Sequence, residues 1–166
     1  MSTHSPLDTP APLALRTMVD ADLPFLQALY ASTREQEMAQ TQWSDQQKAE
    51  FLAFQFDAQH KHYQKHFSSA DFDIVEMEGQ PIGRLYVEYR DDEIRIVDIA
   101  LLPEYRNRGF GQSLLKAVMQ AGQDRKQPIS IHVEQFNPAM RLYIRLGFEK
   151  TADQGVYDLM TWSPHT

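Results

Sequence analysis

Three consecutive runs of β-forming residues in the middle of the sequence most strongly limit the fold of this chain. The runs span residues 73–77, 81–89 and 93–101 and are rich in Ile, Val, Leu and Tyr. Two turn sequences, Glu78-Gly79-Gln80 and Asp91-Asp92, separate them. Runs of this length joined by tight turns predict three antiparallel strands in a meander.

Apolar residues at helical spacing precede and follow these strands. Ser44 and Gln47 form a capping-box pattern at the start of one helical segment, and Gly147 is positioned to end another. The order of elements predicts a mixed α/β (α+β) domain. The expected elements are a strand at residues 13–18, a helix from Asp20 or Asp22 to Tyr30, a helix at 44–66, the three strands, a helix at 109–125, a strand at 128–134, a helix at 137–146 and a hairpin at 148–162.

Composition limits the class of protein. The 166 residues, 42% hydrophobic and 23% charged, predict one globular domain at residues 13–166 behind a flexible leader at 1–12 that is rich in Ser, Thr and Pro. Because the sequence has no Cys, disulfides, thiolate nucleophiles and thiolate metal sites are excluded. No run approaches the roughly 20 apolar residues that cross a bilayer, and no secretory signal is present, so we expect a cytoplasmic protein without a membrane partner.

Charge is distributed unevenly along the chain. The formal net charge is −7, yet residues 104–150 contain eight cations and four anions, which leaves +4 in this stretch and −11 in the remainder. A basic segment within an acidic protein indicates a local site for a polyanion. The acidic pI of about 5.3 argues against sequence-independent binding to nucleic acid.

The segment Arg106-Asn107-Arg108-Gly109-Phe110-Gly111 lies between a predicted strand and the start of a predicted helix. Glycines allow the backbone to approach a ligand, and a helix N-terminus offers unpaired N–H groups and partial positive charge, which suit a phosphate. The segment has no Gly-Lys-Ser/Thr ending and no third glycine, so it fits neither a P-loop nor a dinucleotide fingerprint. A tight helix entry remains the structural alternative.

Residues 99–111 resemble motif A of the GNAT superfamily of N-acetyltransferases, whose pattern is Arg/Gln-x-x-Gly-x-Gly/Ala. A second set of residues resembles motif B of the same superfamily at the expected distance: Asn137-Pro138-Ala139, Leu142-Tyr143 and Leu146-Gly147-Phe148. The resemblance covers residues 73–148. It implies a mostly antiparallel central sheet flanked by helices, with splayed strands that bind acetyl-CoA.

The resemblance also implies which residues hold acetyl-CoA. The backbone of the strand would bind the pantetheine arm, the glycine loop would bind the pyrophosphate, and the following helix would add a contact. Carried over in this order, the residues are Ile99, Ala100 and Leu101; Arg106, Asn107, Arg108, Gly109, Phe110 and Gly111; and Asn137. The basic segment then has a polyanionic ligand.

Tyr143 matches the position of the general acid in many GNAT enzymes, where it would protonate the departing sulfur. A packed interface aromatic is the alternative. The resemblance implies His132 as the first candidate for the proton acceptor, because some GNAT members have a catalytic Glu at this strand position. Glu134 points to the same side of that strand and Asp98 lies on the neighbouring strand, so they are the second and third candidates. A chain of water molecules in place of a side-chain base stays open.

The acceptor is expected to be a primary amine of a small molecule or a protein, acetylated by direct transfer. A catalytically silent acyl-CoA-binding module is the competing hypothesis. His60, His62 and His66 lack a completing ligand pattern, so no metal is expected. A homodimer formed through residues 156–162 as an edge strand is plausible. Weak candidates for substrate contacts are Trp43, Gln55, Gln59, His62 and Tyr63.

Overall fold

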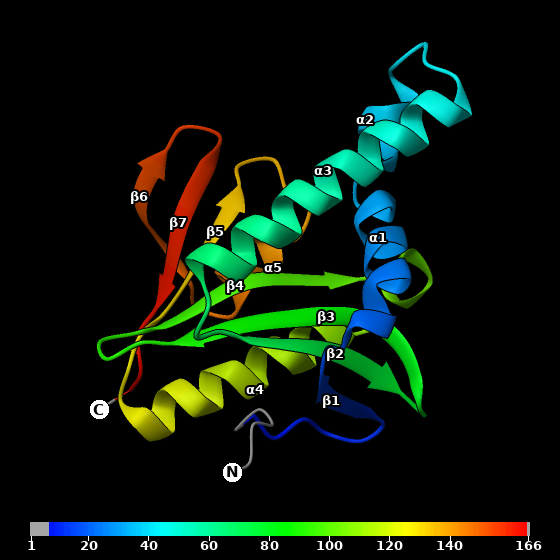
Figure 1. Ribbon diagram of the computed structural model, residues 1–166. Coiled ribbons are helices and arrows are strands. Elements are labelled where there is room, and N and C mark those ends of the chain that lie inside the picture. The colour runs from blue at the N-terminus through cyan, green and yellow to red at the C-terminus, as the bar shows by residue number, and fades with distance from the viewer. Residues whose placement is uncertain (1–6, 166) are drawn as a thin grey trace.

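A computed structural model describes residues 7–165 and contains one twisted sheet of seven strands in the order β1-β2-β3-β4-β5-β7-β6 (Figure 1). All neighbouring strands are antiparallel except β4 and β5. The predicted meander is confirmed as β2, β3 and β4. The strands are β1 (Leu13–Thr17), β2 (Asp71–Met77), β3 (Gln80–Tyr89), β4 (Ile94–Leu101), β5 (Ile129–Glu134), β6 (Glu149–Gln154) and β7 (Tyr157–Trp162).

Five α-helices and two short 3₁₀ turns connect the strands, so the mixed α/β prediction is confirmed. The Ser44 hydroxyl accepts the Gln47 N–H and the Gln47 side chain accepts the Ser44 N–H, as the capping-box pattern predicts. The short α2 was not predicted. The helices are η1 (Asp20–Asp22), α1 (Leu23–Ser32), α2 (Glu35–Ala39), α3 (Asp45–His66), η2 (Pro103–Tyr105), α4 (Phe110–Arg125) and α5 (Met140–Arg145).

The helices form two layers on the sheet. Helix α4 covers one face, while α1 and the long α3 cover the other (Figure 1). The larger core lies on the α4 side and includes Leu85, Ile96, Leu114 and Val118. A smaller core under α1 and α3 includes Leu26, Leu29, Tyr30, Phe56 and Ile74. Burial on both faces explains why β3 is almost wholly buried along its length.

The parallel strands β4 and β5 pair over only three residues each. Ile94, Arg95 and Ile96 face Ile129, Ser130 and Ile131, and beyond this point the strands have no pairing. The register of β3 with β4 also shifts here, because Tyr86 pairs with Asp98 and Val87 pairs with Ile96. Val97 is therefore the extra residue of a bulge, which bends β4 away from β5. The sheet opens in a V between the two strands, as the resemblance implied.

The edge strands differ from the expectation. The prediction that residues 156–162 form an exposed edge is wrong, because β7 pairs with β5 on one side and with β6 on the other. Strand β6 is the edge, and its charged and polar side chains discourage pairing with another chain. Of the predicted leader, residues 1–6 lie outside the described residues, and Leu7 packs against the larger core.

Gly83 sets how closely β3 approaches the end of β4. A Cβ built at this position would collide with the Ala100 carbonyl oxygen and would lie 2.8 Å from Leu101 Cδ2. We therefore expect Gly83→Ala to lower the free energy of unfolding by about 1–3 kcal/mol through overpacking. Urea unfolding measures the change. Gly111→Ala is the control, since its Cβ would meet Leu101 Cδ1 only at 4.0 Å; equal losses in both variants would contradict the prediction.

Candidate functional site

The end of β4 presents unpaired backbone groups to the V-shaped gap. The Leu102 N–H donates to the Ile82 carbonyl at 2.8 Å, so Leu102 and Ile82 form a hydrogen-bonded pair. In an antiparallel ladder, hydrogen-bonded and non-hydrogen-bonded pairs alternate along the two strands. The N–H and C=O groups of Ile99 and Leu101 consequently face away from β3, toward the side that β5 has left. Ala100 was also expected to bind the ligand through its backbone, but its N–H and C=O groups face β3. Two residues of β4 can thus bind an extended ligand as a strand would.

The glycine loop follows directly and leads into α4. Asn107 and Gly109 have φ values of 60° and 86°, the left-handed conformation that turns the chain sharply into the helix. The first N–H groups of α4 have no partner within the helix. A Cβ built on Gly109 would meet nothing within 4 Å, so the surface of the loop is open at this point. The predicted anion cradle therefore has the required backbone geometry.

Five of the eight cations of the basic segment lie at the two ends of α4. Arg106, Arg108 and Arg145 lie at the loop end of α4: Arg106 Nε donates to the Leu101 carbonyl at 2.9 Å, Arg108 stacks on Phe110, and Arg145 donates to Gln112 in the first turn of α4. Arg125 and Lys126, in contrast, lie at the opposite end of the 16-residue helix, roughly 24 Å away at 1.5 Å per residue. Only part of the basic segment can therefore contact one bound anion.

Tyr143 lies in α5 with 5% of its surface exposed, and its ring packs edge-on against Phe148. Burial raises the pKa of its hydroxyl, and the negative charge of Asp98 raises it further. No hydrogen bond of this hydroxyl occurs within the described residues. A hydroxyl that stays protonated can serve as a proton donor.

Asp98 is held in a buried polar network beneath α3. Its Oδ2 accepts hydrogen bonds from Arg84 at 2.7 Å and from the Tyr63 hydroxyl at 2.8 Å. Arg84, whose side chain is 4% exposed, also donates to Gln59 and lies over the rings of Tyr63 and Tyr86. This network anchors α3 to β4 beside the bulge. Asp98 thus carries a charge that is already paired.

The role of Arg84 in a buried ion pair was not predicted, although the sequence contains an indication of it. Arg84 is the one cation of β3 and has apolar or aromatic residues on both sides from Ile82 to Val87, apart from Gly83. A buried charge needs a partner, and that pattern could have indicated a buried ion pair. Gln59 and Tyr63, expected as substrate contacts, are also members of this network.

The other two candidate bases extend from β5 on the same face of the sheet as Asp98. His132 is exposed, and its Nδ1 lies 3.3 Å from Arg95 Nη1. Although the residue is exposed, the partial burial of its ring and the charge of Arg95 lower the pKa of His132. Glu134 Oε1 lies 3.7 Å from Nη1 of Arg34, at the junction of α1 and α2. The Arg34–Glu134 pair therefore joins the two sides of the gap.

The remaining predicted residues have other partners. Asn137 Oδ1 accepts the Ala139 N–H in the turn before α5, and Gln55 Oε1 accepts the Tyr30 hydroxyl. Trp43 packs on Phe51 near the start of α3. The rings of His62 and His66 lie 4.3 Å apart, and within residues 7–165 no cluster of three or more potential ligands could hold a metal. Among the same residues, no helix has both the length and the apolar character needed to cross a bilayer.

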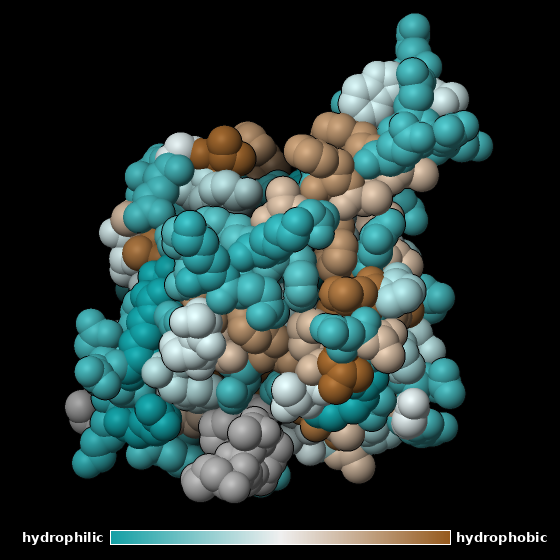
Figure 2. Space-filling view, viewed as in Figure 1, coloured by the Kyte–Doolittle hydropathy of each residue, from teal (hydrophilic) through white to brown (hydrophobic). Residues whose placement is uncertain are grey.

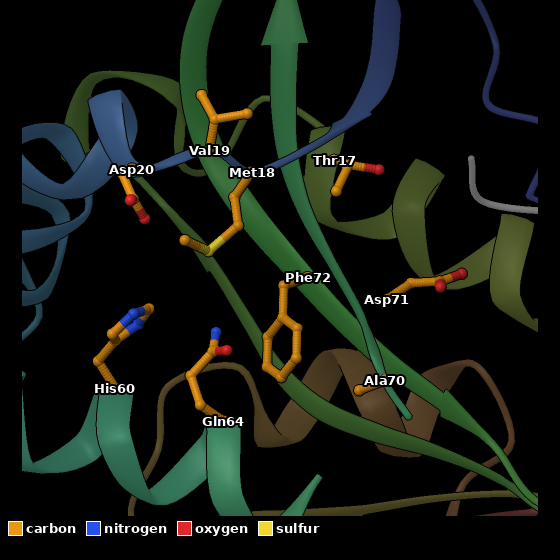
Figure 3. A pocket seen from close by; sticks show the side chains of 9 residues that line it. All are labelled: Thr17, Met18, Val19, Asp20, His60, Gln64, Ala70, Asp71 and Phe72. Carbon is orange, nitrogen blue, oxygen red and sulfur yellow. The ribbon is translucent and has the colours of Figure 1, made fainter. Parts of the chain in front are cut away.

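A separate hollow of about 410 Å³ lies on the other side of α3, against β1 and β2 (Figure 3). His60 and Gln64 of α3 point into it, opposite Asp20, Met18 and Phe72. None of the predicted catalytic or cofactor-binding residues lines this hollow. The hollow is therefore separate from the residues to which the sequence assigns chemistry.

The comparisons with known proteins agree with this geometry. The family model described as the acetyltransferase (GNAT) family matches residues 26–148. No curated protein matches the chain. Among solved structures, the PaiA N-acetyltransferase from Thermoplasma acidophilum in complex with coenzyme A is 14% identical, with a TM-score of 0.69 over 91% of this chain and 98% of that chain.

Two other solved structures have the same fold. The ribosomal-protein-S18-alanine N-acetyltransferase from Escherichia coli is 18% identical, with a TM-score of 0.61 over 93% of this chain and 95% of that chain. A GNAT family acetyltransferase from Elizabethkingia anophelis with acetyl-CoA bound is 15% identical, with a TM-score of 0.60 over 93% and 99% of the two chains. The fold is thus shared over nearly the whole described chain.

Replacing Arg84 alone should destabilise the protein more than replacing both members of the Arg84–Asp98 ion pair. Arg84→Met leaves the largely buried Asp98 without its cation, and we expect a loss of about 3 kcal/mol in the free energy of unfolding. The double variant Arg84→Met/Asp98→Leu should recover part of this loss. Urea unfolding of the wild type, Arg84→Met, Asp98→Leu and the double variant forms the cycle. Lys61→Met, which breaks an exposed pair with Asp57, is the control and should change stability by less than about 0.5 kcal/mol. Strictly additive losses would contradict the prediction.

Proposed function

The chain belongs to the GNAT family of acetyltransferases, and from this membership we propose that it transfers an acetyl group from acetyl-CoA directly to a primary amine. The V-shaped gap carries the proposal. Support for the proposal comes from the backbone edge of Ile99 and Leu101 that β5 leaves, from the open helix N-terminus at Gly109 that follows β4, and from the buried Tyr143, whose hydroxyl is within reach of the charge of Asp98 on β4. A nucleotide-binding domain would need a P-loop lysine or a third glycine, which the loop lacks.

The residues at the gap fit acetyl-CoA. The backbone groups of Ile99 and the N–H of Leu101 suit the amides of a pantetheine arm, and the N–H groups around Gly109 suit a pyrophosphate. Arg106, Arg108 and Arg145 supply positive charge beside the loop. Arg106 already binds the Leu101 carbonyl, so the N–H of Leu101 and both groups of Ile99 are left for the ligand. The solved relatives that carry coenzyme A or acetyl-CoA support this assignment.

Acetyl-CoA supplies the acetyl group as a thioester. The amine nitrogen forms a C–N bond with the acetyl carbon, the C–S bond breaks, the amine loses one proton and the sulfur takes one up. Tyr143 is the proposed proton donor to the sulfur, because burial keeps its hydroxyl protonated. Without cysteine, no acyl-thiol intermediate on the enzyme is possible.

The acceptor approaches from the α3 side of the gap, where carboxylates are available. Glu134 is exposed enough to take the proton of the amine or to bind it as an ammonium ion, and Arg34 is its partner in the free protein. Asp98 adds negative charge but is held by Arg84 and Tyr63. A water molecule between the amine and Glu134 could relay the proton. Action in the cytoplasm, homodimer formation and the absence of a nucleic-acid partner stay predictions from the sequence.

Release of free CoA tests the proposed function. Purified protein is incubated with acetyl-CoA and panels of alkylamines, polyamines, amino acids and peptides, and free thiol is measured together with the mass of the product. We expect amine-dependent release above the rate of thioester hydrolysis. Binding of CoA by calorimetry without release for any amine would favour the silent acyl-CoA-binding module.

Tyr143→Phe separates catalysis from binding. If its hydroxyl protonates the sulfur, turnover should fall roughly 10²-fold, a typical contribution of a general acid, while the Kd of CoA changes little. Tyr89→Phe is the matched control, because this tyrosine lies at the far end of β3 beneath Arg125. Turnover numbers and calorimetric Kd values are compared for the three proteins. Unchanged turnover in Tyr143→Phe would remove this residue from the mechanism.

A further inference from the structure

Arg95 is fixed on the open face of β4 by several hydrogen bonds. Its Nε donates to Ser130 Oγ at 2.7 Å, and its Nη2 donates to Glu93 Oε2 at 3.3 Å. Ser130 Oγ in turn donates to Glu93 Oε1 at 2.6 Å, and Arg90 donates to Glu93 Oε2 at 3.0 Å. The guanidinium is therefore held by β5 and by the turn before β4. Its Nη1 then reaches Nδ1 of His132 at 3.3 Å.

This contact determines which nitrogen of His132 carries the proton. A guanidinium has only donors, so Nδ1 of His132 must act as the acceptor and hold a lone pair. The neutral ring then carries its proton on Nε2. Partial burial and the charge of Arg95 lower the pKa of the ring, although its hydrogen bond with the Gln154 side chain and the charge of Glu93 oppose the shift, so the neutral form is favoured at pH 7 and above. His132 therefore presents an N–H donor rather than a proton acceptor.

His132 lies where β4 and β5 separate. It follows Ile131, the last β5 residue paired with β4, and Asp98 follows the bulge on the opposite strand. The donor on β5 and the carboxylate on β4 therefore both lie where the sheet opens, on the face of the sheet toward α3. The ring is on the face of the sheet that α3 covers only in part. In Figure 2 this face is notched between α3 and the hairpin of β6 and β7.

We propose that His132, with its tautomer set by Arg95, donates from Nε2–H to an oxygen atom beside the amine of the acceptor. This inference rests on the proposed amine acetylation and names the acceptor class as α-amino acid derivatives. A carbonyl or carboxylate oxygen one carbon from the amine would bind at His132 while the nitrogen faces Asp98 and Glu134. The positive charge of Arg95 strengthens the interaction with such an oxygen. This donor role is an alternative to the proton-acceptor role that the sequence suggests.

The tautomer is tested without turnover. Long-range ¹H–¹⁵N correlation spectra of the labelled full chain at pH 8 distinguish a ring protonated at Nε2 from one protonated at Nδ1. We expect the Nε2–H form in the wild-type protein and a mixture of tautomers in Arg95→Met. An Nδ1–H ring in the wild-type protein would overturn the proposal.

Acceptor specificity is tested with a matched pair of amines. Alaninamide carries the carbonyl oxygen, whereas sec-butylamine has the same branching without it. His132→Leu should lower kcat/KM for alaninamide roughly tenfold or more and leave kcat/KM for sec-butylamine within about twofold, because a donor adapted to an oxygen matters only when the oxygen is present. His132→Gln, which retains an N–H donor, should recover part of the loss. His165→Leu, which alters a ring packed on Trp162, is the control.

Several results would overturn the proposal. Equal losses for both amines would mean that His132 acts on the proton of the amine, and unchanged values for both would remove it from the site. If the panel of amines contains a substrate but alaninamide is not acetylated, the assignment of the acceptor class fails; if no amine of the panel is acetylated, the proposed function fails and the inference is decided by binding alone. In that case the His132 Nε2 resonance is followed with CoA present: a shift on adding alaninamide but not sec-butylamine supports the donor role, and equal responses to the two amines refute it.

Discussion

The structure depends on the loss of pairing between two parallel strands after only three residue pairs. Up to Ile96 and Ile131 the sheet is continuous, and its backbone groups satisfy one another. Beyond them the bulge at Val97 bends β4 away, so the N–H and C=O groups of Ile99 and Leu101 lose a strand partner. Unsatisfied backbone groups at the centre of a sheet are costly unless a ligand or water takes the place of the strand. The gap is therefore both an interruption of the sheet and the reason that it can bind an extended molecule.

Several contacts hold the two sides of this gap in place. On the β4 side, Arg106 ties the end of the strand to Ser32 of α1, and the Arg84–Asp98–Tyr63 network ties it to α3. Across the gap, Arg34 reaches Glu134. These contacts are long-range in sequence and largely charged, and their strength depends on burial. Arg84 is almost wholly buried, so its loss leaves an unpaired charge, whereas the longer Arg34–Glu134 contact can yield to a bound acceptor.

Features that depend on residues close in the chain could be predicted from the sequence, whereas contacts between residues far apart in the chain could not. The meander, the capping box at Ser44 and the glycine loop depend on residues close in the chain, and the structure has all three. The edge of the sheet was assigned to the wrong strand of the hairpin, because the pairing of β7 with β5 spans residues far apart. The same distance hid the partner of Arg84. Helix α2 has only five residues, which is too short for a periodic pattern.

The assignment of chemistry to His132 shows why strand parity alone is insufficient. Parity places His132, Glu134 and Asp98 on one face, and by residue type each could accept a proton. Their partners separate them: Asp98 is held by Arg84 and Tyr63, Glu134 lies against Arg34, and His132 accepts a hydrogen bond at Nδ1 from Arg95. Arg95 is in turn fixed by Ser130 and Glu93, residues that no catalytic motif contains. The residue type therefore limits the possible roles, and the hydrogen bond on the far side of the ring selects among them.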